Sequence, residues 1–384
     1  MRQGAFAAML VMATVAIDDW AAAQSRDDDL RAMVERLGAD SYAVRDQAER
    51  TLIEGGLAAQ AHLMTALNSP DAEVRYRARR ILDHVVGIDF QMRLTAFIRD
   101  DKGRFEHNLA GWRQYRELAG NTAASRRLFA EMQLAEAPFL QAIESKPTDA
   151  EFEMKACCDR VHEMISHYEP GMPRAAQLPH VASLFLTGAR SDVAISSELA
   201  IMVGNLTIQP VVHAEIVTGD EASPMRRLLA AWVARNPGDD ARSTQTNMML
   251  ALRFEMREGL AAAVALAQDA SVAPQIKQYA LILIAKYGDT SHVPLAESLL
   301  DDATLFQTRP VGGGELSTQL RDVALAALVL ITKQPPKEYG LDSLPANNVT
   351  IFNSTSIGFL SDEDRHAAHA KWRAWRAAHP PVTP

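Results

Sequence analysis

The sequence predicts an all-α protein, an α-α superhelix of stacked antiparallel helix pairs. Three observations predict this fold class: a helical motif that recurs along the chain, apolar residues at helical spacing, and a composition suited to helix packing. Of the 384 residues, 48% are hydrophobic but only 6% are aromatic, and Ala and Leu are abundant, as helix-on-helix contact prefers. Runs that alternate apolar and polar residues, which indicate strands, are scarce.

The recurring motif reads V-R-x-x-A-x-x-x-L. It occurs at Val44–Leu52 and again at Val74–Leu82. A third copy lies at Leu320–Leu328, and a looser copy, with Lys277 in place of the arginine, lies at Ile276–Ile284. Because a larger side chain would push a neighbouring helix away, the central Ala predicts close contact between helices.

Each of the first two copies follows another helix and a short turn. Apolar residues at i, i+3, i+4 and i+7 from Leu30 place one apolar stripe on the first of these helices. Ser41 and Asp71 stand where helix N-caps belong, with a side-chain oxygen for the free N–H groups of the first turn. One such pair cannot bury its apolar face alone, whereas stacked pairs can, so the pattern predicts a solenoid.

These units resemble HEAT repeats, in which the Val and Leu fill the core and the Arg bonds to neighbouring turns. Other stretches resemble a bacterial family of secreted HEAT-repeat proteins of unassigned function, so this second resemblance bears on fold and compartment only. The stretches that carry it are Gly111–Trp112, Tyr115, Gly120, Arg127–Phe129, the helix Leu320–Leu328, Lys337–Gly340, Asp364–Arg365, Trp372 and Trp375.

The spacing of apolar residues predicts five segments. They are a signal peptide over 1–23, N-terminal HEAT-like repeats over 24–90, a divergent helical middle over 91–240, C-terminal HEAT-like repeats over 241–333, and an irregular segment with a capping helix over 334–384. We expect Ser361 to cap the last helix, on which Trp372 and Trp375 share a face and pack onto the last repeat.

The N-terminus has the pattern of an export signal. Arg2 precedes an apolar core, Gly4–Ile17, and Ala21–Ala23 offers a cleavage site after Ala23. This predicts a periplasmic or secreted protein; the alternative is a protein anchored by an uncleaved signal. Later runs fall short of the roughly 20 apolar residues of a membrane span, so no span is expected after the signal is removed.

Charge argues against a nucleic-acid partner. Removal of 1–23 takes away one positive and two negative charges, which changes the net charge from −9 to −8, and an acidic chain is a poor match for phosphate. One basic cluster, Arg75, Arg77, Arg79 and Arg80, has two interpretations. It binds an acidic partner or polymer, or Arg75 and Arg79 pair with Asp71, Glu73 and neighbouring helices, which we favour.

Cysteines, histidines and glycines are the candidate binding residues of the sequence. Cys157 and Cys158 are adjacent, which leaves a strained vicinal disulfide or, as we favour, two thiols on a helix. A metal needs three or four converging donors. Cys157 and Cys158 with His162, and His366 and His369 near Asp362, are candidate sets, and for both we favour a role without a metal. Gly312–Gly314 lacks the neighbouring residues of a phosphate loop, so 303–317 is predicted to be a flexible connector.

No catalytic motif is present in the sequence. We therefore assign no catalytic, cofactor-binding or metal-binding residue and expect no cofactor. The favoured function is an exported scaffold that binds a protein or peptide on its concave face. The alternative is an enzyme, a HEAT-like lyase or hydrolase, with a site in the non-repeat middle or in 337–358.

Overall fold

A computed structural model describes residues 24–167, 177–219, 222–238, 240–312, 314–342, 344, 351–352 and 357–380. The predicted signal peptide, 1–23, lies outside the described residues. The all-α class predicted from the sequence is confirmed, because helices make up nearly all of the regular structure. Contacts divide the chain into two compact units, one reaching Leu109 and one beginning at Ala110, and each is described separately.

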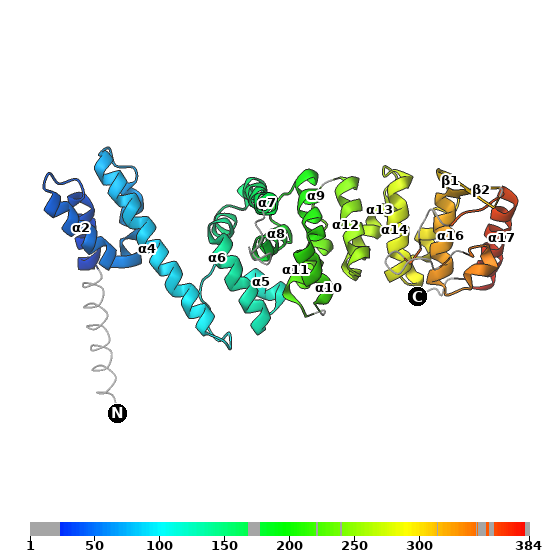
Figure 1. Ribbon diagram of the computed structural model, residues 1–384, viewed down its shortest axis with the longest axis horizontal. Helices are drawn as coiled ribbons and strands as arrows, with labels where there is room; N and C mark the ends of the chain where they lie inside the picture. Colours follow the sequence, from blue (N-terminus) through cyan, green and yellow to red (C-terminus); the bar gives the residue numbers. More distant parts are fainter. Residues whose placement is uncertain are drawn as a thin grey trace, which may run out of the picture. The chain divides into compact units, whose positions relative to one another are not determined.

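The first unit contains both N-terminal copies of the motif (Figure 1, blue to cyan). Its helices are 24–36, α2 (Tyr42–Gly55), a 3-10 turn η1 (Gly56–Ala59), α3 (Gln60–Ala66) and α4 (Ala72–Arg99). Ala48 and Ala78, the small residues of the two copies, are 1% and 0% exposed. They belong to one apolar core with Leu37, Leu52 and Leu63. The predicted close contact at the motif alanine is therefore confirmed here.

The arginines of these two copies bind the turn that precedes their own helix. Arg45 Nη1 donates to the carbonyl oxygens of Ala39 and Asp40 at 2.7 and 2.9 Å. Arg75 Nη1 repeats the arrangement one copy later, with the carbonyls of residues 69 and 70 at 2.7 and 2.8 Å. Since a turn leaves carbonyls without backbone partners, the motif arginine satisfies them and ties the turn to the helix that follows it.

The motif valines differ between the two copies. Val74 is 8% exposed, whereas Val44 is 40% exposed, so the expected core position of Val44 is wrong. A methyl group of Val74 lies close to Gly38, in the turn of the preceding copy. Val44 lies in the first copy of the motif, so among the described residues there is no turn of a preceding copy to cover it as Gly38 covers Val74.

The two predicted N-caps also differ, and this gives a test. Asp71 accepts from the Glu73 N–H at 2.8 Å, while Ser41 occupies the N-cap position of α2 without a side-chain cap bond. Asp71→Ala is expected to lower the free energy of unfolding by about 1 kcal/mol, and Ser41→Ala by at most a few tenths. Urea denaturation followed by circular dichroism measures both, and equal losses would contradict this assignment.

The second unit is a succession of helices. They are α5 (Trp112–Ala119), α6 (Ala123–Ser145), η2 (Pro147–Asp149), α7 (Ala150–Ser166), α8 (Leu178–Gly188), α9 (Ser197–Asn205), η4 (Leu206–Ile208), α10 (Pro210–Thr218), α11 (Pro224–Arg235), α12 (Ala241–Arg253), η5 (Arg257–Gly259), α13 (Leu260–Gln268), α14 (Pro274–Tyr287), η6 (Thr290–His292), α15 (Val293–Glu297), α16 (Leu320–Ile331), η7 (Pro336–Tyr339) and α17 (Asp362–Ala378).

Helices of this unit pack mainly on near neighbours in sequence. α8 contacts α6, α7 and α11, and α12, α14 and α16 form successive layers, with α17 against α16 (Figure 1). The motif alanines of α14 and α16, Ala280 and Ala324, are both 0% exposed. The closing helix begins as predicted, because the Ser361 side chain accepts from the Asp364 N–H.

One prediction for this unit is wrong. The segment 303–317 is not a flexible connector but belongs largely to a β-hairpin, β1 (Leu305–Val311) and β2 (Gly314–Gln319). Val311 pairs with Gly314, so two residues connect the strands, and Gly312 has φ +56°, as a tight hairpin turn requires. Backbone bonds between Ser317 and Phe359 join β2 to the segment before α17.

Among the described residues, no single helix is both long and apolar enough to cross a membrane. One neighbouring pair, Ser197–Ile208 and Pro210–Thr218, meets that criterion only when the two are taken together, with a bend of 75° between them.

Candidate functional site

The middle of the chain contains a buried carboxylate at a helix kink. Pro138 lies inside α6, where it has no N–H for the helical hydrogen bond. Glu136, two residues earlier, has φ −137° and ψ 27°, which is outside the helical range. The kink turns this side chain into the protein, where it is only 2% exposed. Irregular backbone of this kind is a reason to examine a site for function.

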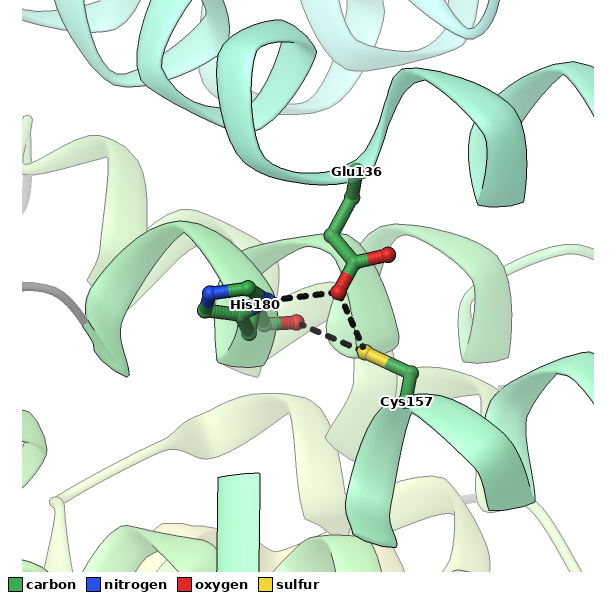
Figure 2. A group of neighbouring side chains, drawn as sticks. All are labelled: Glu136, Cys157 and His180. Carbon is green, nitrogen blue, oxygen red and sulfur yellow. Dashed lines mark hydrogen bonds and ion pairs between the residues drawn. The ribbon is translucent and has the colours of Figure 1, made fainter. Parts of the chain in front are cut away.

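Three side chains from two other helices meet this carboxylate, and Figure 2 shows two of them, Cys157 and His180. His180, in the first turn of α8, places Nδ1 2.5 Å from Glu136 Oε1. The Cys157 thiol, on α7, lies 3.4 Å from the same oxygen. Arg160, one turn further along α7, donates Nε to Oε1 at 3.1 Å and Nη2 to Oε2 at 2.6 Å. One carboxylate thus joins α6, α7 and α8.

Burial and charge set the protonation of this cluster. Burial alone would raise the pKa of Glu136, but the hydrogen bonds and positive charges of His180 and Arg160 outweigh it and lower the pKa. The pKa of the Cys157 thiol is raised, first by burial and then by the negative charge of Glu136. At neutral pH the carboxylate is therefore ionised and the thiol is protonated.

These protonation states indicate what the cluster can do. A cysteine nucleophile needs a lowered pKa and access to substrate, whereas Cys157 has a raised pKa and is 0% exposed. The carboxylate, thiol and imidazole instead supply oxygen, sulfur and nitrogen donors within 4.8 Å of one another. Such a set suits coordination better than nucleophilic catalysis.

The structure does not bring together the cysteines and histidines that the sequence offers as candidates for a disulfide or a metal site. Cys157 and Cys158 are free thiols on α7, which rules out the vicinal disulfide here, and both are buried, with the pKa of Cys158 raised by burial to about 12. His162 directs its Nδ1 to the backbone oxygen of Cys158 at 2.9 Å rather than joining the thiols. His366 is exposed while His369 is 3% exposed, so they do not converge.

Two arginines of the basic cluster, Arg77 and Arg80, pair with neighbouring acids, and they are not the two that the sequence predicts to do so. Arg77 binds Glu49 at 2.8 Å and Glu73 at 2.7 Å, and Arg80 also pairs with Glu49. Arg75 binds turn carbonyls instead of Asp71 or Glu73. The expected Arg75 pairing is therefore wrong, but the interpretation of the cluster as mainly structural agrees with these contacts.

A pocket of about 560 Å³ lies beside part of the segment 337–358. Charged residues on its walls include Arg309, Glu338 and Lys371, and Lys371 Nζ lies 2.6 Å from a Glu338 oxygen. Residues 343, 345–350 and 353–356 lie outside the part of the chain that the structure describes, so the alternative enzyme site remains a prediction.

An open groove of about 1000 Å³ lies along the C-terminal half of α4 in the first unit. Its walls include Ile88, Met92 and Phe105, which are 46%, 67% and 66% exposed. Asp83 and Arg99 line it at opposite ends of this part of α4. Large exposed apolar side chains gathered in one hollow are typical of a binding surface.

Comparison with known proteins adds no assignment. The sequence matches no model of a known protein family and no curated protein.

Sequence reasoning did not find Glu136, Arg160 or His180. The three are separated by 20 or more positions along the chain, and no known motif joins them. The one available signal was Pro138 inside a predicted helix, which marks a kink without saying which side chain it turns inward.

Proposed function

We propose that this protein is an exported helical scaffold, similar to HEAT-repeat proteins, that binds an amphipathic helical segment of another protein. The signal-peptide pattern at 1–23 supports export. The repeated contact of Arg45 and Arg75 with their turns supports the HEAT resemblance. The observation that carries the binding proposal is the apolar groove along α4.

The groove defines the chemistry of the partner. Ile88 and Met92 are one helical turn apart on α4, and Phe105 adds a third exposed apolar group, so the groove suits the apolar stripe of a helix. Met also adapts its shape to different partners. Asp83 and Arg99 are about 24 Å apart at 1.5 Å per residue, which fits about 16 residues with a basic and an acidic end.

A synthetic peptide tests this proposal. The probe is a fluorescein-labelled amphipathic helix of about 16 residues, with a Leu and Met stripe, Lys at one end and Glu at the other, and binding is read by fluorescence anisotropy. We expect saturable binding in the micromolar range, about −8 kcal/mol. Met92→Glu should weaken it at least about tenfold, because a charge would enter the apolar contact.

Met64→Glu is the matched control. Met64 is 54% exposed on α3 of the same unit and is not part of the groove, so its substitution should leave the affinity unchanged. A probe with Lys at both ends should bind more weakly, since it faces Arg99. Absence of saturable binding, or equal losses for the two Met variants, would refute the proposal.

A further inference from the structure

We propose that Glu136, Cys157 and His180 form a Zn²⁺ site that ties α6, α7 and α8 together. Their donor atoms, a carboxylate oxygen, Sγ and Nδ1, lie within 4.8 Å of one another. Figure 2 shows the Cys157 and His180 side chains both directed at the same carboxylate oxygen, Glu136 Oε1. The site is independent of the groove along α4.

The donor set selects the metal. Thiolate and imidazole favour zinc over magnesium or calcium, and three protein ligands with a water in the fourth position are a common zinc arrangement. Zinc ligands sit about 2.0–2.3 Å from the metal. Insertion therefore requires Glu136 Oε1 and His180 Nδ1, now 2.5 Å apart, to separate by somewhat less than 1 Å.

Arg160 is placed to orient the carboxylate toward the metal. Its Nη2 holds Glu136 Oε2 at 2.6 Å and its Nε donates to Oε1 at 3.1 Å, so Oε1 faces the cysteine and the histidine, and metal binding replaces the longer of these two bonds. Such outer partners hold a ligand in position for the metal. The Arg160 side chain is 44% exposed and that of His180 13% exposed, so the cluster lies just beneath the surface and an ion can reach it.

Zinc binding is a ligand exchange without redox change. The Cys157 thiol loses its proton to solvent, His180 Nδ1 loses to solvent the proton that it holds toward Glu136 Oε1, and bonds form from the metal to Sγ, Oε1 and Nδ1 as coordinated waters leave. The thiolate and the carboxylate bring two negative charges to the metal, while Arg160, which is paired with the same carboxylate, keeps one positive charge beside them. Binding therefore releases one proton from Cys157, and a second from His180 where its ring is cationic, and it strengthens as the pH rises.

Cobalt substitution gives a direct test. The full-length protein is freed of metal by a chelator and titrated with Co²⁺, which reports sulfur ligation by a near-ultraviolet charge-transfer band. Because the chain has only two cysteines, such a band can come only from Cys157 or Cys158. We expect one equivalent to bind, with the band absent in Cys157→Ala and retained in Cys158→Ala, which removes an equally buried thiol from the same helix.

Zinc itself provides a second measurement. At a free concentration about 100 times its dissociation constant, Zn²⁺ should raise Tm of the wild type and of Cys158→Ala by roughly 5–10 °C. Arg160→Met should weaken zinc binding about 10–100-fold, as loss of an outer partner does. Circular dichroism confirms that each variant is folded.

His180→Ala keeps the proposal testable if Cys157→Ala fails to fold, because His180 lies in the first turn of α8 and is less buried than the thiol. His180→Ala should also abolish the one-to-one binding of Co²⁺. The proposal is overturned if no equivalent of Co²⁺ binds to the wild type, if His180→Ala binds as tightly as the wild type, or if Cys158→Ala removes the charge-transfer band.

Discussion

Arg365→Met is expected to lower the free energy of unfolding by about 3–5 kcal/mol. Arg365 on α17 is 1% exposed, and its Nε lies 2.9 Å from a carboxylate oxygen of Asp322, which is 0% exposed at the start of α16. The same guanidinium donates to the backbone oxygen and hydroxyl of Ser317 on β2 at 3.0 and 2.8 Å. Its removal leaves a buried carboxylate without its cation and breaks the side-chain link between α17, α16 and β2.

Urea denaturation followed by tryptophan fluorescence measures this loss, because Trp372 and Trp375 lie on the same helix. Arg373→Met, an exposed substitution on α17, should change stability by no more than about 0.5 kcal/mol. Burial raises the pKa of Asp322 even with Arg365 beside it, so the loss should shrink in acid, where this carboxyl becomes neutral. If Arg365→Met lowers the free energy of unfolding no more than Arg373→Met does, the ion pair does not hold α16, α17 and β2 together.

Through His369, the wild type is expected to lose about 3 kcal/mol of its free energy of unfolding as the pH falls from 6.5 to 4. The variant His369→Leu should not show this loss. Burial, followed by the charges of Arg321, Arg373, Arg365 and His366, lowers the pKa of His369 from 6.5 to about 4. Above pH 6.5 the ring is neutral in both states and contributes nothing. As the pH falls toward 4, His369 becomes protonated in the unfolded chain but stays neutral in the folded protein, so the free energy of unfolding decreases.

The measurement is the free energy of unfolding at several pH values, compared between the wild type and each variant. His366→Leu is the control, since His366 lies one turn earlier on α17 and is exposed. Carboxylates elsewhere add acid sensitivity to every variant alike, so the difference from the wild type isolates His369. Identical pH profiles for the wild type and His369→Leu would contradict a neutral buried ring.

Local patterns predicted the repeats well because their determinants lie close together in sequence. Arg45 and Arg75 bind carbonyls five and six residues away, and Asp71 caps its own helix. Ala48 and Ala78 recur at fixed places in a helix, so their burial follows from periodicity. Contacts of this range can be read from a short window of sequence.

The candidate site could not be predicted in this way. Glu136 meets His180 across 44 positions, and the meeting depends on how α6 bends at Pro138 and on how α8 packs against α6 and α7. The hairpin was missed for a different reason. Its glycine run was interpreted as flexible, although Gly-Gly between two strands also favours a tight turn with positive φ.

The same hairpin has a consequence for self-association. β1 pairs only with β2 among the described residues, so its other edge is free to meet the strand of a second molecule, which is a common start of aggregation. Arg309 and Pro310 stand in the middle of this strand. Proline has no N–H to offer a further strand, and a charge resists stacking, so the sequence of β1 itself protects the protein from edge-to-edge polymerisation.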